Sequence, residues 1–404
     1  MRDLVCLPQT RLAYALILGA LAALGPLCTD LYLPALPDIA QQFTAPTSVV
    51  QLTLTATLLG LGVGQLLFGP LSDSLGRRRT LLSSLVLFVV ASLGCTLATD
   101  IHQLLVARLL QGIAGSGGIV LSRAIARDLY QGHELTRFYA LLMMINGVAP
   151  IGAPVLGGEL LRLVDWRGIF AVLTTIVLLL TLASTLQVRE TLPPQQRTPG
   201  GLRQTLQQIR QLLTLRPFMG LCLAQGFTIA GMFAYIGASS FVLQQLYGLT
   251  PQQFSLCFAV NGIGLILMAQ VAARLSNQLG EIHVLQGGLI LAMSAASLLV
   301  LAGLCHAPLP LVLICLFFSV TVNSVIGTTS VSRAMQAVSP ESGGAASALL
   351  GLAMFALGAL SVPFTGLGGT SMLTMSLTIL GCYAIAVLLY WRVHGWQGRR
   401  ARGR

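Results

Sequence analysis

The most regular feature of this sequence is the alternation of long apolar runs with short polar interruptions. Runs such as 81–98, 168–188 and 284–304 contain no charged residue. A bilayer core about 30 Å thick requires about 20 apolar residues per helix, whereas a helix in a soluble protein keeps a polar face. The pattern therefore predicts membrane-spanning helices. We place twelve of them at residues 12–36, 49–71, 80–98, 102–126, 138–162, 168–188, 217–243, 253–273, 284–304, 309–332, 343–367 and 371–392.

One polar stretch, residues 189–216, interrupts this pattern in the middle of the chain. It contains two adjacent prolines and a Gln-rich amphipathic piece, and it is too polar to span a bilayer. The sequence therefore predicts an N-terminal six-helix half at 1–188, a cytoplasmic linker at 189–216 and a C-terminal six-helix half at 217–404.

The two predicted halves share short sequence echoes at equivalent places. The sequence LSDSLG at 71–76 follows the second span, and LSNQLG at 275–280 follows the eighth. The triplet SRA ends both the fourth span, at 122–124, and the tenth, at 332–334. A six-helix repeat is typical of carriers whose substrate site lies between two halves near the bilayer midplane.

Composition and charge placement support a membrane protein and exclude a nucleic-acid-binding one. The chain is 55% hydrophobic and 9% charged, with a formal net charge of +11, and every basic residue is arginine. On the predicted topology only Arg162 and Arg167 lie on the outer side and Arg108 lies within a span; all the other arginines share one side. The positive-inside rule then places both termini in the cytoplasm. We expect a multi-pass protein of the bacterial cytoplasmic (inner) membrane.

The N-terminus allows a second interpretation. Arg11, the apolar run after it and the Ala-Leu-Ala at 20–22 could form a cleaved signal peptide. The apolar run continues to Leu36, however, and we therefore expect an uncleaved first span.

Enzyme and metal motifs are missing from the sequence. A Walker GxxxxGK[ST] loop cannot exist without lysine, and neither HExxH nor CxxC occurs. The eight cysteines are scattered and form no ligand pattern. We expect no enzymatic activity, no metal and no cofactor. A ligand sensor or scaffold is a further alternative, but it predicts large soluble loops that this chain lacks.

Two charged residues, Asp30 and Arg108, lie inside predicted spans and away from the ends of those spans. A charge inside the bilayer is costly, so such residues normally face the bundle interior or a water-filled cavity. Removal from water disfavours the ionised form of a carboxyl group, which suits a side chain that gains a proton from one side and loses it to the other. Asp30 could instead form a fixed ion pair with Arg108 or stay wet near the outer surface. Arg108 could tune a facing acid, bind an anionic substrate or hold helices together.

Three further motifs resemble those of the major facilitator superfamily. The loop GPLSDSLGRRR at 69–79 is similar to the family's G-x-L-[SA]-D-x-x-G-R-[RK] signature, and RLLQG at 108–112 is similar to its R-x-x-Q-G pattern. The sequence GVAPIGAPVLGG at 147–158 resembles the antiporter motif, with Ala153 where many members have glycine. The resemblance implies an all-α integral membrane protein with the major facilitator fold, twelve transmembrane helices in two pseudo-symmetric six-helix halves.

A finer resemblance is to the Bcr/CflA group of drug:proton antiporters. It rests on TDLYLPALP at 29–37 and RAIARDL at 123–129. The resemblance implies a carrier, expected to be monomeric, that exports drug-like molecules in exchange for protons by alternating access. The alternative within the same fold is a proton-coupled carrier for a native metabolite such as an amino acid or nucleoside. The expected partners are the small-molecule substrate, protons and the lipid bilayer.

The resemblance also assigns candidate roles to residues. Asp30 and Arg108 would couple transport to protons. The expected cytoplasmic gate consists of Gly69, Asp73, Gly76, Arg77 and Asp128, and the antiporter motif of Gly147, Pro150, Pro154, Gly157 and Gly158. Candidate substrate residues are Tyr32, Asn146, Gln225, Phe233, Tyr235 and Asn323, with Gln51, Gln65 and Asn261 on flanking helices and Thr321 on a cavity helix.

Overall fold

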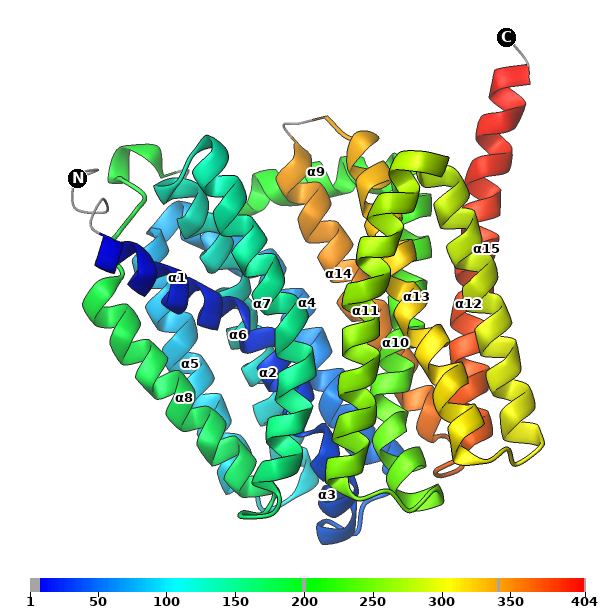
Figure 1. Cartoon of the computed structure of the whole chain (residues 1–404). Helices are drawn as coiled ribbons and strands as arrows, with labels where there is room; N and C mark the ends of the chain where they lie inside the picture. Colours follow the sequence, from blue (N-terminus) through cyan, green and yellow to red (C-terminus); the bar gives the residue numbers. More distant parts are fainter. Residues whose placement is uncertain (1–7, 198–200, 340–341, 403–404) are drawn as a thin grey trace. The chain divides into compact units, whose positions relative to one another are not determined.

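The chain is an assembly of long helices. A computed structural model describes residues 8–197, 201–339 and 342–402, and within these ranges it contains helices and no β-strand (Figure 1). Twelve helical segments, from Tyr14–Gln42 to Met372–Arg392, are long and apolar enough to cross a membrane. The predicted fold class and span count are confirmed.

Local chemistry explains where several of these helices begin. The Asp100 and Asp165 side chains accept hydrogen bonds from main-chain N–H groups in the first turns of α6 (Ile101–Leu129) and α8 (Trp166–Gln187). Thr250 and Gln253 form a reciprocal capping box at the start of α11 (Pro251–Leu279). Such caps satisfy N–H groups that have no partner inside the helix.

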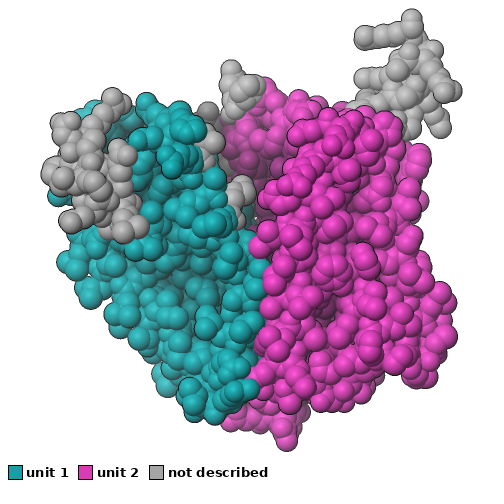
Figure 2. All heavy atoms as spheres, in the orientation of Figure 1, with its two compact units in different colours: residues 1–35, 56–204 teal, residues 36–55, 205–404 magenta. Residues whose placement is uncertain are grey.

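Contacts divide the chain into two compact units, coloured separately in Figure 2. The first unit contains residues 1–35 and 56–204. Within it α6 packs against α5, α1 and α2, and α5 packs against α8. Its elements are α1 (Pro8–Ala22), α2 (Leu24–Asp30), η1 (Leu33–Ala35), most of α4 (Thr47–Leu75), α5 (Arg77–Leu97), α6 (Ile101–Leu129), α7 (Gly132–Leu160), α8 (Trp166–Gln187) and η2 (Pro194–Gln196).

The second unit contains residues 36–55 and 205–404. Its central helix, α10, packs against α13, α14 and α15, and α13 also packs against α11 and α12. Its elements are α3 (Leu36–Gln42), the start of α4, most of α9 (Gly201–Thr214), α10 (Arg216–Phe241), the π-helical turn η3 (Val242–Leu246), α11 (Pro251–Leu279), α12 (Glu281–Leu304), α13 (Leu309–Gln336), α14 (Gly343–Ser361), η5 (Val362–Gly366) and α15 (Met372–Arg402).

These units depart from the sequence halves in two places. Residues 189–204, from the predicted linker, cluster with the first unit, and residues 36–55, from the predicted N-terminal half, cluster with the second. Helix α4 is continuous from Thr47 to Leu75, so the division passes through one helix after Thr55.

The first span, predicted as one helix, is broken into α1, α2, η1 and α3. Pro34 and Pro37 lie beyond the end of α2. Proline lacks an N–H group and disfavours a helical conformation in the residue before it, which explains why the regular helix does not continue. As a result, Asp30 is the last residue of α2 and not a mid-helix residue.

The sequence echo between the halves corresponds to the same backbone turn. Gly76, between α4 and α5, has φ 100°, and Gly280, between α11 and α12, has φ 84°. Both angles lie in a region that favours glycine because it has no Cβ. The repeated LSxxLG sequence therefore encodes a repeated connection between helices.

Candidate functional site

Arg108 is a fully buried cation in the middle of the first unit. Its guanidinium carbon lies 4.0 Å from the centre of the Tyr32 ring and 5.5 Å from that of Phe170. Its Nη1 donates to the main-chain oxygen of Cys28 at 2.8 Å and also to the Gln111 side chain. The two rings and the two acceptors hold the guanidinium between α2, α6 and α8.

The hydrogen-bonding capacity of Arg108 is only partly used. Its Nε and Nη2 atoms are buried and have no hydrogen-bond partner among the described residues. A buried charge without full pairing is destabilising, and removal of its N–H groups from water is not compensated. The arrangement therefore leaves one edge of a rigidly held cation available to an anionic group or to water.

Gln111 connects Arg108 to the next helix. Its Oε1 accepts from Arg108, and its Nε2 donates to Ser92 Oγ on α5 at 2.8 Å. Gln111 therefore has a fixed amide orientation, and the R-x-x-Q-G motif acts here as a hydrogen-bonded pair.

Asp30 is buried at the end of α2, with 5% of its surface exposed. It is close enough to Arg108 for an electrostatic interaction. Among the described side chains, however, no ion pair joins the two residues: the contacts of Arg108 are those to Cys28, Gln111 and the two rings. The fixed ion pair considered from the sequence is therefore absent, and so is the solvent-exposed position.

The helix carrying the antiporter motif, α7, packs directly beside Asp30. A Cβ at Gly157 would overlap the main chain of Leu31, the residue after Asp30. Ala153, which replaces the glycine of many relatives, is 1% exposed, and Pro150 and Pro154 lie inside the helix. Small residues let two helix backbones approach closely in a membrane. Gly147 and Gly158 lie on the same helix.

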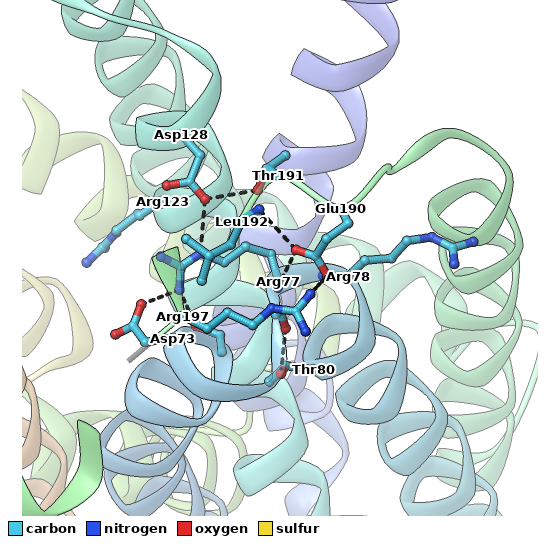
Figure 3. Close-up of polar contacts among 12 residues, drawn as sticks. Asp73, Arg77, Arg78, Thr80, Arg123, Asp128, Glu190, Thr191, Leu192 and Arg197 are labelled. Atoms are coloured by element: carbon cyan, nitrogen blue, oxygen red, sulfur yellow. Dashed lines mark hydrogen bonds and ion pairs between the residues drawn. The ribbon is translucent and has the colours of Figure 1, made fainter. Parts of the chain in front are cut away.

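Where α4 meets α5, the structure brings two predicted gate residues, Asp73 and Asp128, together around a third, Arg77 (Figure 3). Its Nη1 donates to Asp73 Oδ1 at 2.5 Å and to Ser72 Oγ at 2.6 Å, and its Nε donates to Asp128 Oδ2 at 3.0 Å. Arg77 thereby joins the end of α4, the start of α5 and the end of α6. Such charge-assisted bonds are among the stronger ones in proteins.

A third carboxylate in this cluster, that of Glu190, was missed by sequence reasoning. Glu190 Oε1 accepts from the main-chain N–H of Arg77 at 2.8 Å and of Leu192 at 3.1 Å, and its Oε2 accepts from the N–H of Arg78 at 3.3 Å. Glu190 therefore accepts hydrogen bonds at the N-terminus of α5. A signal was present, because Glu190 is the single acidic residue between positions 189 and 216.

The segment after α8, residues 188–197, thus forms a strap over the start of α5. Thr191 Oγ1 donates to Asp128 Oδ2 at 2.9 Å, and Arg78 Nε donates to the Val188 carbonyl at 2.9 Å. Gly76 lies beneath the strap, and its φ of 100° would strain any other residue; a Cβ there would also meet the ends of the Glu190 and Arg197 side chains. Gly69 has free space around it and no comparable constraint.

The candidate substrate residues fall into different environments. Tyr32 is 1% exposed and belongs to the Arg108 cluster. In the second unit, Asn323 Nδ2 donates to the Tyr383 hydroxyl, which donates to the Ser319 carbonyl, so Asn323 fixes α13 against α15. Phe233 packs beside Phe355. The Asn146 side chain lies outside the described residues.

Two other candidates in the second unit, Tyr235 and Gln225, differ in their polar contacts. Tyr235 accepts a hydrogen bond from Asn261 Nδ2 at 2.8 Å. Gln225 is buried, and its Oε1 has no partner within the described residues. Asn261 also borders a groove of about 280 Å³ between α11 and α13, whose other lining residues are Cys257, Val260, Leu313, Ile314, Phe317 and Phe318.

Comparison with known proteins gives a consistent result. Residues 18–363 match the sequence profile of the Major Facilitator Superfamily. The uncharacterized MFS-type transporter YdgK of Bacillus subtilis is 42% identical over 91% of this chain and 92% of its own length. The bicyclomycin resistance protein homolog of Haemophilus influenzae is 28% identical over 94% and 95%, respectively. A bacterial homolog of the human lysosomal transporter Spinster shares the fold, with a TM-score of 0.74 and 16% identity over 96% of this chain and 97% of that one.

Proposed function

The chain belongs to the Major Facilitator Superfamily, and from that premise we propose that it exports drug-like small molecules from the cytoplasm in exchange for protons. The observation that carries this proposal is the pair Asp30 and Arg108: both are buried in the first unit, and no direct ion pair joins them. An Asp30 carboxylate fixed in a permanent ion pair with Arg108 would stay ionised and would not exchange a proton. A carboxyl group that lies near the cation without such a bond can gain and lose a proton.

The names of two relatives indicate the class of compound that we propose this carrier exports. One relative is named as a bicyclomycin resistance protein homolog, and another, from Pseudomonas aeruginosa, as a chloramphenicol resistance protein. Together with the antiporter-motif helix α7 beside Asp30, these names favour export of xenobiotics over uptake of a metabolite.

In the proposed cycle, Asp30 is deprotonated when the carrier admits a compound from the cytoplasm. The compound leaves on the outer side, and protonation of Asp30 then resets the carrier. Arg108 stays charged throughout and stabilises the ionised state of Asp30. A membrane potential contributes about 2.3 kcal/mol per charge moved per 100 mV, which is sufficient to drive accumulation against a gradient.

A drug-susceptibility panel tests this proposal. We compare wild type, Asp30→Asn and Asp38→Asn in an efflux-deficient bacterium; Asp38 lies in the same span but is exposed. Asp30→Asn removes the exchangeable proton, so it should reduce export at least about tenfold, equivalent to about 1.4 kcal/mol in the barrier. Asp38→Asn should retain resistance. If wild type protects against no compound, or if Asp30→Asn protects as well as wild type, the proposal is wrong.

A further inference from the structure

The groove between α11 and α13 lies in the second unit, away from the buried charges described above. The two helices pack side by side (Figure 1), and the groove between them has a volume of about 280 Å³. Asn261 is the one amide among the side chains that line it, and the others are hydrophobic. The Asn261 Nδ2 atom donates to the Tyr235 hydroxyl at 2.8 Å. The groove is therefore an apolar surface whose amide donor already has a partner.

The groove ends where the two helices touch. A Cβ at Gly264 on α11 would overlap the methyl group of Thr321 and the ring of Phe317 on α13, so the helices approach closely at this level. All the residues that line the groove precede Gly264 on α11 and Thr321 on α13. The groove therefore extends from this contact toward the ends at which both helices begin.

The groove lies at the depth of lipid acyl chains. Residues 257–261 come six to ten residues after Pro251, the start of α11, and residues 313–318 come four to nine residues after Leu309, the start of α13. With a rise of 1.5 Å per residue, they lie about 6–15 Å from the helix ends, and half of a hydrocarbon core measures about 15 Å. Both helices are long and apolar enough to cross a membrane. The groove therefore lies in the half of the bilayer on the side where both helices begin.

The mouth of the groove opens on the face of these helices that contacts hydrocarbon. Every exposed residue at positions 254–269 of α11 and 311–318 of α13 is apolar. These residues are Leu256, Val260, Ile263 and Leu267 on α11 and Leu311, Ile314 and Phe318 on α13. A helix face in contact with water would carry polar side chains here. The groove is therefore continuous with the surface that the protein presents to lipid.

The size and chemistry of the groove favour a hydrocarbon chain over a drug-sized compound. Sites for drug-sized ligands typically measure about 300–1,000 Å³ and place several polar groups around the ligand. This groove is smaller, its rim residues Val260 and Ile314 are about half exposed, and its amide already bonds to Tyr235. A linear chain needs no polar partner, and without an occupant the lining would lose van der Waals contacts on one side.

We propose that the groove between α11 and α13 binds one acyl chain of a membrane phospholipid, from the leaflet on the side where these two helices begin. The chain lies against Val260 and Ile314 and covers Asn261, so it completes the wall between the bilayer and the Tyr235 hydroxyl. Packing drives this binding, because lipid tails are as apolar as the groove itself. A chain in the groove contacts protein on two sides, whereas a chain beside a single helix contacts it on one.

Photolabelling with a phospholipid that carries a diazirine in one acyl chain tests the site. The full chain is reconstituted with this lipid in vesicles of phosphatidylethanolamine and phosphatidylglycerol, irradiated and mapped by peptide mass spectrometry. We expect labelling of residues 257–261 and 313–318 to exceed that around Leu298 on α12 at least about threefold, because a chain held on two sides stays longer. Leu298 is a matched reference for Ile314: both are 55% exposed, and Leu298 lies six residues before the end of α12 that leads into α13.

Substitutions in the groove separate this site from general contact with lipid. Ile314→Trp places a larger side chain in the groove and should lower its labelling to the level around Leu298, whereas Leu298→Trp should leave labelling of the groove unchanged. Val260→Trp, from the opposite wall, replaces Ile314→Trp if that variant fails to fold. Equal labelling of the groove and α12 in wild type, or groove labelling that persists in both groove variants, would overturn the site. The labelling needs neither substrate nor a proton gradient, so its outcome is independent of the proposed export.

Discussion

At the scale of single residues, Arg108 is an unusual feature of this protein. It is fully buried and, in the part of the chain that the structure describes, two of its nitrogen atoms have no hydrogen-bond partner, although two aromatic rings and two acceptors fix its position. Replacement of buried charges by apolar residues of similar size is often neutral or stabilising. Arg108 does not maximise stability, yet its contacts fix its position. Its proposed role in transport explains this combination best.

Arg108→Met should separate stability from transport. Methionine fills much of the same volume, so we expect thermal stability in detergent to change by no more than about 2 kcal/mol. Export, measured by drug retention in cells, should fall at least about tenfold, because the ionised state of Asp30 loses its nearby cation.

Arg162→Met is the matched control for this substitution. Arg162 pairs with Glu159 at 3.3 Å, and both side chains are more than half exposed. This ion pair therefore contributes little to the free energy of unfolding. Transport by Arg108→Met at the wild-type rate would show that Arg108 serves packing alone.

At the scale of elements, the strap of residues 188–197 organises the end of the first unit where α4, α5 and α6 meet. Glu190 accepts hydrogen bonds at the N-terminus of α5, where the helix dipole favours a negative charge. Thr191 in the same strap contacts Asp128, so one short segment supports both the helix start and the Arg77 cluster.

Glu190→Gln should loosen this element measurably. The neutral amide keeps the side-chain shape but weakens the bonds to the Arg77 and Arg78 N–H groups, so we expect a loss of about 1–2 kcal/mol in the free energy of unfolding. Thermal unfolding of purified protein measures the loss. Glu159→Gln, at the exposed end of α7, should unfold like wild type. Equal unfolding temperatures for all three proteins would show that the strap does not stabilise the unit.

Sequence reasoning worked best where a residue type contrasts with its surroundings. Asp30 and Arg108 were identified because a charge in an apolar run is conspicuous, and the spans follow from hydropathy alone. Glu190 was missed because its partners are main-chain N–H groups, which leave no trace in the sequence. Gln51 was placed on a flanking helix, but the sequence does not reveal that its helix begins in the other compact unit. Such pairings between distant segments depend on tertiary packing.

At the scale of the whole molecule, the two units repeat their backbone turn but not their charges. Gly76 and Gly280 share a positive φ, yet the position after Gly280 is Glu281, which accepts from Ser332 Oγ at 2.6 Å and takes the place of Arg77. Among the residues whose burial is described, all the buried charged ones, Asp30, Arg77 and Arg108, lie in the first unit. The proposed proton chemistry is therefore concentrated in one half of a repeated architecture.

The direction of proton movement tests this view of the molecule. In inside-out vesicles with an acidic lumen, an antiporter takes up substrate while protons leave, so adding substrate should raise the luminal pH reported by a trapped dye. A protonophore should abolish accumulation, and Asp30→Asn should give no pH change. A fall in luminal pH on substrate addition would instead indicate symport, as expected of a metabolite carrier.

The continuity of α4 across the two units has a consequence for protein engineering. A chimera that exchanges the predicted halves would cut the chain at the predicted linker, residues 189–216. This cut would carry residues 36–55 along with the first half and place Gln51 and Thr55, which donate to the main-chain oxygens of Gly237 and Ala359, against a foreign partner. A functional exchange of halves must therefore transplant Gly237 and Ala359 as a matching surface, so the modules of this fold are not the same as its sequence repeats.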